Sequence, residues 1–168
     1  MISWLTTKSI APAAPASALR FVRQAAVARQ VNQRLAKNLA HQPFVDGNCL
    51  DCHEAHSSPV AAAALLVKEE RSLCLDCHSD AVNLANSVLH KPLSGDCSQC
   101  HEAHASDAIA LLSEHPPALC FTCHHATRRE LLSMTEQHPP FARGECMDCH
   151  EAHDSPHVGL LVQNERQL

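Results

Sequence analysis

Ten cysteines in fixed pairs constrain this chain more than any other feature of its sequence. All ten fall in five copies of one arrangement, Cys-x-x-Cys followed at once by His, and no cysteine is left over. The copies are Cys49-Cys52-His53, Cys74-Cys77-His78, Cys97-Cys100-His101, Cys120-Cys123-His124 and Cys146-Cys149-His150. Five motifs in 168 residues leave about 34 residues each, a size range in which metals, disulfides or partners usually replace a side-chain core.

The composition agrees with this constraint. The chain has four Phe, one Trp, no Tyr and four Gly, and its 45% of hydrophobic residues rests largely on Ala and Cys. An ordinary single-core globular domain is therefore excluded, because large aliphatic and aromatic side chains dominate such cores. No run of 18 or more apolar residues occurs, so no transmembrane segment is predicted.

The spacing CxxCH is the attachment signature of a c-type haem. Two thiols one helical turn apart can each form a thioether with a porphyrin vinyl group, and the following His is then held beneath the ring as an iron ligand. We expect five haem c groups, anchored by the ten cysteines, with His53, His78, His101, His124 and His150 as proximal ligands.

Three other uses of paired cysteines were weighed. Zinc ribbons also space CxxC pairs by about 15–20 residues, but five pairs cannot be matched two by two, and zinc needs no His after each pair. A disulfide framework leaves the five histidines unexplained. A thioredoxin-like redox pair requires βαβ patterning around it, which is not found.

The motifs belong to a longer repeat. Each repeat opens with His-x-Pro, at His41, His90 and His138, and continues with a Cys-His-Glu-Ala-His run and a Leu pair. First cysteines recur 48 and 49 residues apart, which indicates a modular array. Residues 160–168 (LLVQNERQL) align with residues 65–73 (LLVKEERSL), after which Cys74 opens the next motif. The sequence therefore stops where a sixth site would begin, either as a five-haem product or as a piece of a longer array.

We divide the chain into an N-terminal arm (1–40) and a pentahaem domain (41–168) of two and a half repeats, 41–89, 90–137 and 138–168. Residues 41–168 resemble the doubled-CxxCH class of multihaem c-type cytochromes. Its members include pentahaem electron donors to periplasmic nitrite reductase and decahaem components of outer-membrane conduits. The resemblance implies a mainly α or irregular fold, with short helices and loops wrapped around a chain of haems and little or no β-sheet.

Six further histidines recur by repeat position and are candidate distal ligands. They are the HxP histidines His41, His90 and His138, and the histidines that end CHEAH, namely His56, His104 and His153. One scheme assigns the HxP histidine to the first haem of its repeat and the CHEAH histidine to the second, leaving His153 as a spare or alternative ligand. A competing scheme gives the HxP histidine to the last haem of the preceding repeat.

Enough histidines are present for every iron to have two, which favours electron transfer over catalysis because no coordination position is open. The alternative is a multihaem oxidoreductase with one open iron. Glu54, Glu102 and Glu151 stand between the two His of each CHEAH, and they are either acceptors that orient an imidazole or solvent-facing residues. The Leu pairs are interpreted as apolar contacts to a haem edge.

Charge is divided unevenly along the chain. Residues 1–45 carry +6 and the remainder −11. Apolar residues at helical spacing predict a helix from about 17 to 40, which either packs on the haem body or docks on an acidic partner. The chain lacks a base-stacking platform, so nucleic-acid binding is not predicted. We expect redox protein partners, with a membrane-associated complex, homo-oligomer or filament as further possibilities.

Haem c is attached outside the cytoplasmic membrane, so the resemblance implies a periplasmic or extracellular protein of bacterial or archaeal type. The N-terminus contains small residues suited to cleavage, but Thr6, Thr7, Lys8 and Ser9 interrupt any apolar stretch. The sequence therefore carries no convincing signal peptide.

Overall fold

The computed structural model describes residues 37–59 and 64–168. Most of the predicted helix at 17–40 lies outside these residues. Its last part is wrong, because Leu39–Ala40 form the extended strand β1. The strand forms since these two residues pair with a distant segment of the chain.

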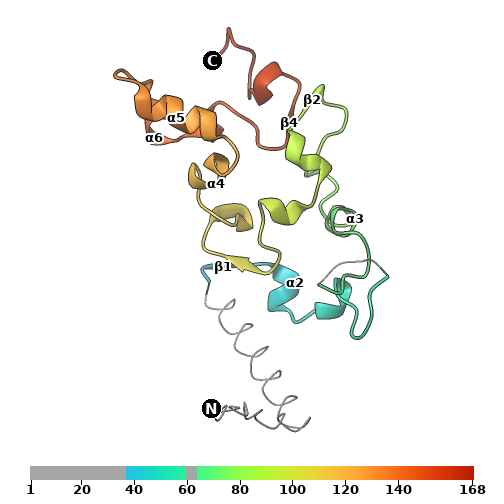
Figure 1. The fold of residues 1–168 in the computed structure, drawn as a ribbon. Coiled ribbons are helices and arrows are strands. Elements are labelled where there is room, and N and C mark those ends of the chain that lie inside the picture. The colour runs from blue at the N-terminus through green and yellow to red at the C-terminus, as the bar shows by residue number, and fades with distance from the viewer. Residues whose placement is uncertain (1–36, 60–63) are drawn as a thin grey trace, which may run out of the picture.

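Short helices and turns account for most of the regular structure (Figure 1). The α-helices are α2 (Gln42–Val45), α3 (Glu70–Leu75), α4 (Ala118–Phe121), α5 (His125–Ser133) and α6 (Pro139–Arg143). The 3-10 helices are η1 (Cys49–Asp51), η2 (Lys91–Ser94), η3 (Cys97–Gln99), η4 (Ile109–Leu111), η5 (Cys146–Asp148) and η6 (Val158–Leu160). The strands are β1 (Leu39–Ala40), β2 (Val88–Leu89), β3 (Ala105–Ser106) and β4 (Asp154–Ser155). The predicted fold class, mainly helical or irregular with little sheet, is confirmed.

Each HxP segment starts a helical turn for a reason that is visible in the sequence. His41, His90 and His138 are extended residues at the N-cap, and a proline occupies the first or second helical position after each. Proline is favoured there because its fixed φ suits the helix and its missing N–H would have no partner within the helix. The HxP histidines therefore sit where extended backbone turns into a helix.

Two small antiparallel sheets join segments that lie far apart in the chain. Strand β1, at the end of the N-terminal arm, pairs with β3 of the second repeat, and β2, at the end of the first repeat, pairs with β4 of the third. The backbone N–H of His41 donates to His104 at 2.8 Å, and that of His90 donates to His153 at the same distance. Each joint thus places an HxP histidine next to a CHEAH histidine from elsewhere in the chain.

Carboxylates reinforce both joints. Asp107 accepts hydrogen bonds from the Lys37 side chain at 2.6 Å and from the Asn38 backbone at 3.2 Å. At the second joint, Asp154 accepts from the Asn83 backbone at 2.9 Å and from the Asn86 side chain. The hydrogen bond from Lys37 is the main reason that the pKa of Asp107 lies below its ordinary value.

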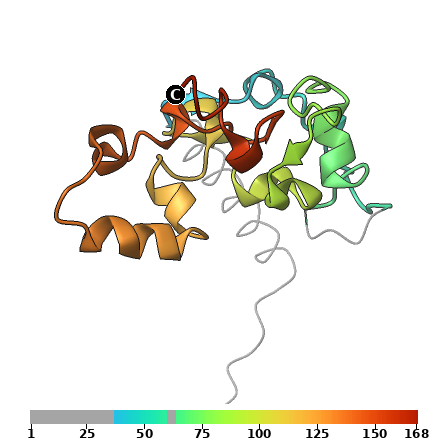
Figure 2. The ribbon, with the colours of Figure 1, turned by 90° about the horizontal axis from the view of Figure 1, so that it is seen from above.

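Side chains provide almost no core. Among the described residues only Ala105, Ser106, Ala108 and Ser155 are buried, while twelve large apolar side chains are exposed. Figure 2 shows the fold from above, with α5 on the opposite side from α3. None of the helices in the described ranges is long and apolar enough to cross a membrane.

The two buried serines hold a recurrent loop. Ser155 donates to the Leu161 carbonyl at 2.6 Å and accepts from the His157 backbone at 2.9 Å. Ser106 makes the equivalent bonds to Leu112 and Ala108. A serine two residues after the CHEAH histidine therefore ties the Leu pair of its repeat back to the strand.

Replacing Ser155 with Ala should lower the free energy of unfolding by about 1–2 kcal/mol, because a partly buried backbone carbonyl and N–H lose their partner. The matched control is Ser133→Ala at the exposed end of α5, where we expect a change within about 0.5 kcal/mol. Denaturant unfolding of the haem-loaded protein measures both. Equal effects of the two substitutions would contradict the assigned role of Ser155.

Replacing Asp107 with Asn should produce a pH-dependent loss of stability. The folded-state pKa of Asp107 is lowered from 3.8, so its contribution is present at neutral pH and disappears as the pH falls through the lowered pKa. The melting temperatures of the wild type and Asp107→Asn should therefore differ at pH 7 and converge in acid. A difference that stays constant across this range would contradict the prediction.

Candidate haem-binding site

The five CxxCH motifs share one backbone conformation. In each, the N–H of the final His, here called the proximal histidine, donates to the carbonyl of the first Cys at 2.9–3.0 Å. This i to i−4 bond closes one helical turn, which places both cysteines and the histidine on the same short segment. These turns fall in η1, η3 and η5 and at the C-terminal ends of α3 and α4.

Four proximal histidines lie beside a second imidazole at a nearly constant spacing. The ring centroids are 5.9 Å apart for His41 and His78, 5.8 Å for His53 and His104, 6.1 Å for His90 and His124, and 6.0 Å for His101 and His153. Three of the pairs are close to parallel, with interplanar angles of 13–29°, and the fourth is tilted by 54°.

The pairs follow one rule across the repeats. The HxP histidine lies beside the second proximal histidine of its own repeat, as His41 does with His78. The CHEAH histidine lies beside the first proximal histidine of the preceding repeat, as His104 does with His53. Every such CHEAH pair therefore joins two repeats.

This rule differs from both schemes drawn from the sequence. The first scheme placed His41, His90 and His138 with the first proximal histidine of their own repeats, and His56 and His104 with the second. It also left His153 as a spare, whereas His153 lies beside His101. The competing scheme placed His90 with His78, whose neighbour is His41. Both schemes considered position along the chain alone, while the strand joints bring distant repeats together.

Three histidines have no such partner among the described residues. His56, His138 and His150 are exposed, and no ring pair that involves them occurs within residues 37–59 and 64–168. The structure therefore brings together eight of the eleven candidate iron ligands.

Backbone carbonyls fix the orientation of five imidazoles. The Nδ1 atoms of the proximal His53, His101 and His150 lie 2.7–2.9 Å from the carbonyls of Ala64, Ala110 and Gly159. His90 and His153, two of the candidate distal ligands, bond in the same way to Ala152 and Ala81, at 2.9 and 2.8 Å. Because a carbonyl can only accept, Nδ1 carries the proton and Nε2 keeps its lone pair for a metal.

These carbonyls come from a turn with unusual backbone angles. Ala110 and Leu111 have φ of 54° and 55°, and in the third repeat Gly159 and Leu160 have φ of 75° and 57°. Left-handed angles are unfavourable for non-glycine residues, yet they recur where the loop turns its carbonyl toward the proximal imidazole. The role that we considered for Glu54, Glu102 and Glu151 is thus taken by the backbone, and these glutamates are exposed.

The Leu pairs have a structural role that the sequence did not reveal. Isolated bridges join His53 to Leu66, His101 to Leu112 and His150 to Leu161. These bridges are made by backbone atoms. The Leu pairs therefore hold the loop against the CxxCH motif through their backbone, independently of the contacts that their side chains make. The sequence did carry a signal for this loop, because the serine that bonds to the Leu pair recurs two residues after each CHEAH histidine, at Ser58, Ser106 and Ser155.

The paired imidazoles fit a six-coordinate haem iron. A metal–imidazole bond is about 2 Å long and the ring centre lies about 1 Å beyond the nitrogen, so two rings on opposite sides of one iron have centroids about 6 Å apart. The four observed pairs have this spacing. The scarcity of buried side chains among the described residues is likewise expected where porphyrins form the interior.

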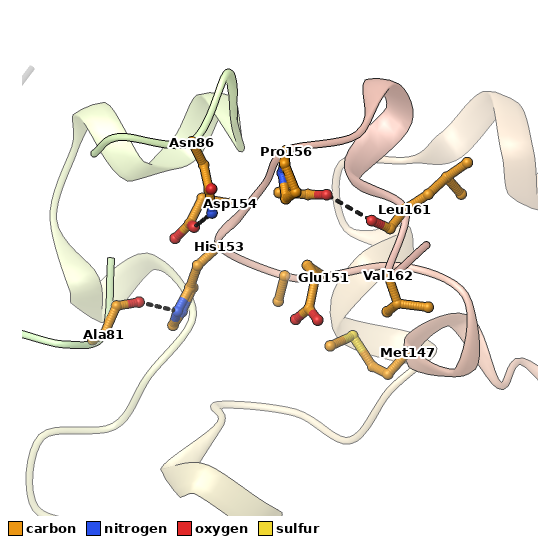
Figure 3. Close-up of a pocket in the computed structure, with 11 residues that line it drawn as sticks. Ala81, Asn86, Met147, Glu151, His153, Asp154, Pro156, Leu161 and Val162 are labelled. Carbon is orange, nitrogen blue, oxygen red and sulfur yellow. Dashed lines mark hydrogen bonds between the residues drawn. The ribbon is translucent and has the colours of Figure 1, made fainter. Parts of the chain in front are cut away.

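A cavity of about 450 Å³ borders one of the pairs. Figure 3 shows Ala81 and Asn86, from the first repeat, beside His153 and Asp154 of the third repeat, and all four residues line this cavity. Met147, Leu161 and Val162 give the opposite wall an apolar lining. Its volume lies within the range of about 300–1,000 Å³ that is usual for cofactor sites.

Cysteines of consecutive motifs lie close together. Burial, reinforced by the neighbouring Cys97 thiol, raises the pKa of Cys74 to about 12. Burial and then Cys146 raise the pKa of Cys120. Burial is also the main cause of the raised pKa values of Cys52 and Cys100, with smaller contributions from Cys77 and Cys123, respectively. The five motifs therefore follow one another in space in the order of the sequence.

The electrostatics of His90 suit a neutral ligand. Burial lowers its pKa, and the nearby His124 and His153 lower it further, while the hydrogen bond to Ala152 acts in the opposite direction. A lowered pKa keeps the imidazole neutral near pH 7, which is the form that binds a metal.

Comparison with known families agrees with this geometry. The model of the doubled CXXCH motif matches residues 41–83, 90–129 and 138–168, more than half of the chain. The repeats mark a multihaem c-type cytochrome, a class that carries electrons and is exported from the cytoplasm. The chain belongs to the doubled CXXCH motif family. A search of curated proteins returned no match.

Replacing Ala110 with Gly should raise the free energy of unfolding by up to about 1 kcal/mol, because glycine adopts a positive φ without a steric cost. The control is Ala142→Gly inside α6, where we expect a loss of about 0.5–1 kcal/mol. Unfolding of the haem-loaded variants compares the two. If Ala110→Gly destabilises the protein as much as the control, the backbone at Ala110 is not strained.

Proposed function

We propose that this protein is an electron carrier in which five haem c groups form a continuous path between redox partners. The observation that carries the proposal is the set of four imidazole pairs at 5.8–6.1 Å, each combining a proximal histidine with a histidine from the HxP or CHEAH position. Haem iron supplies one-electron chemistry by cycling between ferrous and ferric states.

The chain's own residues anchor and orient the cofactors. Cysteine pairs hold each porphyrin, and imidazoles on both faces leave no position for a substrate, which favours a carrier over an enzyme. The bonds from Nδ1 to backbone carbonyls make His53 and His101 more basic ligands, which stabilises the ferric state. The proximity of Cys74 to Cys97 and of Cys120 to Cys146 supports close spacing of successive haems.

The site of action follows from haem attachment. Haem c is attached after export, so we place the protein in the periplasm or outside the cell. Its partners are then redox proteins, and residues 46–168 present them with an excess of carboxylates, a formal charge of −11. Such a surface attracts basic partners at low ionic strength.

One observation favours a second candidate, an oxidoreductase with one open iron. His150 has no imidazole beside it within the described residues, so the fifth haem is the position where a small ligand could bind. Lasting binding of CO or nitrite to the fifth haem under all conditions would favour this candidate over the carrier.

The ligand pairs can be tested by removing one histidine at a time, which leaves an open coordination position on one haem iron. In His104→Ala we expect one additional haem to bind CO in the reduced protein, because His53 loses its opposite ligand. The extra CO-binding haem should disappear when Cys49 and Cys52 are also replaced by Ala, and it should persist when Cys120 and Cys123 are replaced instead.

The reverse pattern would contradict the pairing, since the scheme drawn from the sequence assigns His104 to the haem at Cys120 and Cys123. No additional CO binding in His104→Ala would contradict bis-histidine ligation at this site. Haem counts from pyridine haemochrome spectra check that each variant with a replaced cysteine pair has lost one haem.

A further inference from the structure

We propose that the backbone carbonyl of Ala81 sets the imidazole of His153 across that of His101, and that the haem between them is electronically distinct from its neighbours in the path. This haem, attached at Cys97 and Cys100, is here called the third haem. The inference rests on the proposed haem ligation. It assigns positioning roles to residues that are not iron ligands.

The pair formed by His101 and His153 differs from the other imidazole pairs in one respect, the angle between its rings. That angle is 54°, whereas the other three pairs lie 13–29° from parallel. The distance between the ring centroids is 6.0 Å, within the 5.8–6.1 Å range of the four pairs. The rings are therefore rotated relative to each other without being displaced.

Both rings of this pair are anchored to backbone carbonyls. Nδ1 of His101 lies 2.9 Å from the carbonyl of Ala110, and Nδ1 of His153 lies 2.8 Å from that of Ala81. A hydrogen bond from Nδ1 lies close to the ring plane, so each carbonyl selects the rotation of its own ring. Because the two carbonyls belong to distant segments of the chain, the two rotations are set independently.

Two of the nearly parallel pairs lack this double anchor. Of His90 and His124, only His90 bonds to a carbonyl in the part of the chain that the structure describes, and the angle is 17°. Neither ring of His41 and His78 forms a hydrogen bond within residues 37–59 and 64–168, and the angle is 29°. A ring without an anchor can rotate to follow its neighbour, which the rings of His101 and His153 cannot do.

The Ala81 segment is held in place by the carboxylate of Asp154, the residue that follows His153. Asp154 accepts hydrogen bonds from the backbone N–H of Asn83 at 2.9 Å and from the side chain of Asn86. Figure 3 shows the bond from Asn86 to Asp154 beside the bond between His153 and Ala81. The ring and the carboxylate of consecutive residues thus grip one segment of the first repeat, which fixes the direction of the Ala81 carbonyl.

All three repeats meet at this pair. His101 belongs to the second repeat, His153 to the third and Ala81 to the first. The third haem is also the middle one of the five in the order of the sequence. A shift of the first repeat against the third would therefore change the ligands of the haem in the middle of the proposed path.

The angle between two axial imidazoles has a spectroscopic consequence. Each imidazole donates π electrons to the iron d orbital that its ring plane selects, so parallel rings separate the energies of two d orbitals. Crossed rings keep these energies close together. A low-spin ferric haem with crossed rings consequently gives a more anisotropic electron paramagnetic resonance (EPR) signal, with a larger maximum g value, than a haem with parallel rings.

The test is EPR spectroscopy of the oxidised, full-length, haem-loaded protein. We expect one strongly anisotropic low-spin signal that integrates to about one haem in five. This signal should disappear when Cys97 and Cys100 are both replaced by Ala. In Asp154→Ala it should move toward the signal of parallel rings, because the Ala81 segment and with it the ring of His153 are released.

Two further variants keep the test specific. Asn86→Ala removes one of the two bonds to Asp154 without changing a residue adjacent to an iron ligand, and it should move the signal in the same direction by a smaller amount. Asp107→Ala is the control, because it breaks the carboxylate contacts of the other joint; it should leave the signal unchanged. A haem count of five and unchanged CO binding in these single variants show that the ligands are retained.

Three results would overturn the inference. The first is a wild-type spectrum without the anisotropic signal, and the second is a signal that survives the loss of Cys97 and Cys100. The third is a signal that responds to Asp107→Ala as much as to Asp154→Ala and Asn86→Ala, or to none of them. Five low-spin haems that all give parallel-ring signals would leave the proposed function intact, whereas a haem count other than five would contradict the proposed function itself.

Discussion

The pairing of imidazoles between repeats is the interaction on which the rest of this structure depends. His104 lies beside His53 and His153 beside His101, so residues about 50 positions apart meet across one site. The strand joints β1–β3 and β2–β4 carry the same connection in the backbone. Side-chain packing contributes little to this connection, since the described part of the chain buries only two alanines and two serines.

Local backbone strain serves the same interaction. A turn that contains left-handed residues such as Ala110 and Leu111 presents a carbonyl to the Nδ1 atom of a proximal histidine, and a buried serine holds the turn in place. Strained angles of this kind persist where the surrounding structure determines them. The hydrogen bond to this carbonyl holds the imidazole in a single orientation, in which Nε2 can bind a metal.

The helical turn at each CxxCH motif was predictable because it depends on adjacent residues. CxxCH spacing alone indicates the helical turn at each motif, and the HxP prolines indicate where further helices begin. The imidazole pairs were harder to predict, because His41 and His104 reach their neighbours through strands of two residues that carry no alternation in sequence. The same short strand explains why the helix predicted to reach residue 40 was wrong at residues 39–40. The orienting carbonyls of Ala64, Ala110 and Gly159 could not be predicted, since any residue supplies a carbonyl.

The account requires that the ten cysteines carry porphyrins. Intact mass of the purified protein, combined with a pyridine haemochrome spectrum, tests this most directly. We predict a mass gain equal to five haem groups and a spectrum that gives five haems per chain. A colourless protein without the mass gain, or one that holds zinc at its cysteines, would contradict the account.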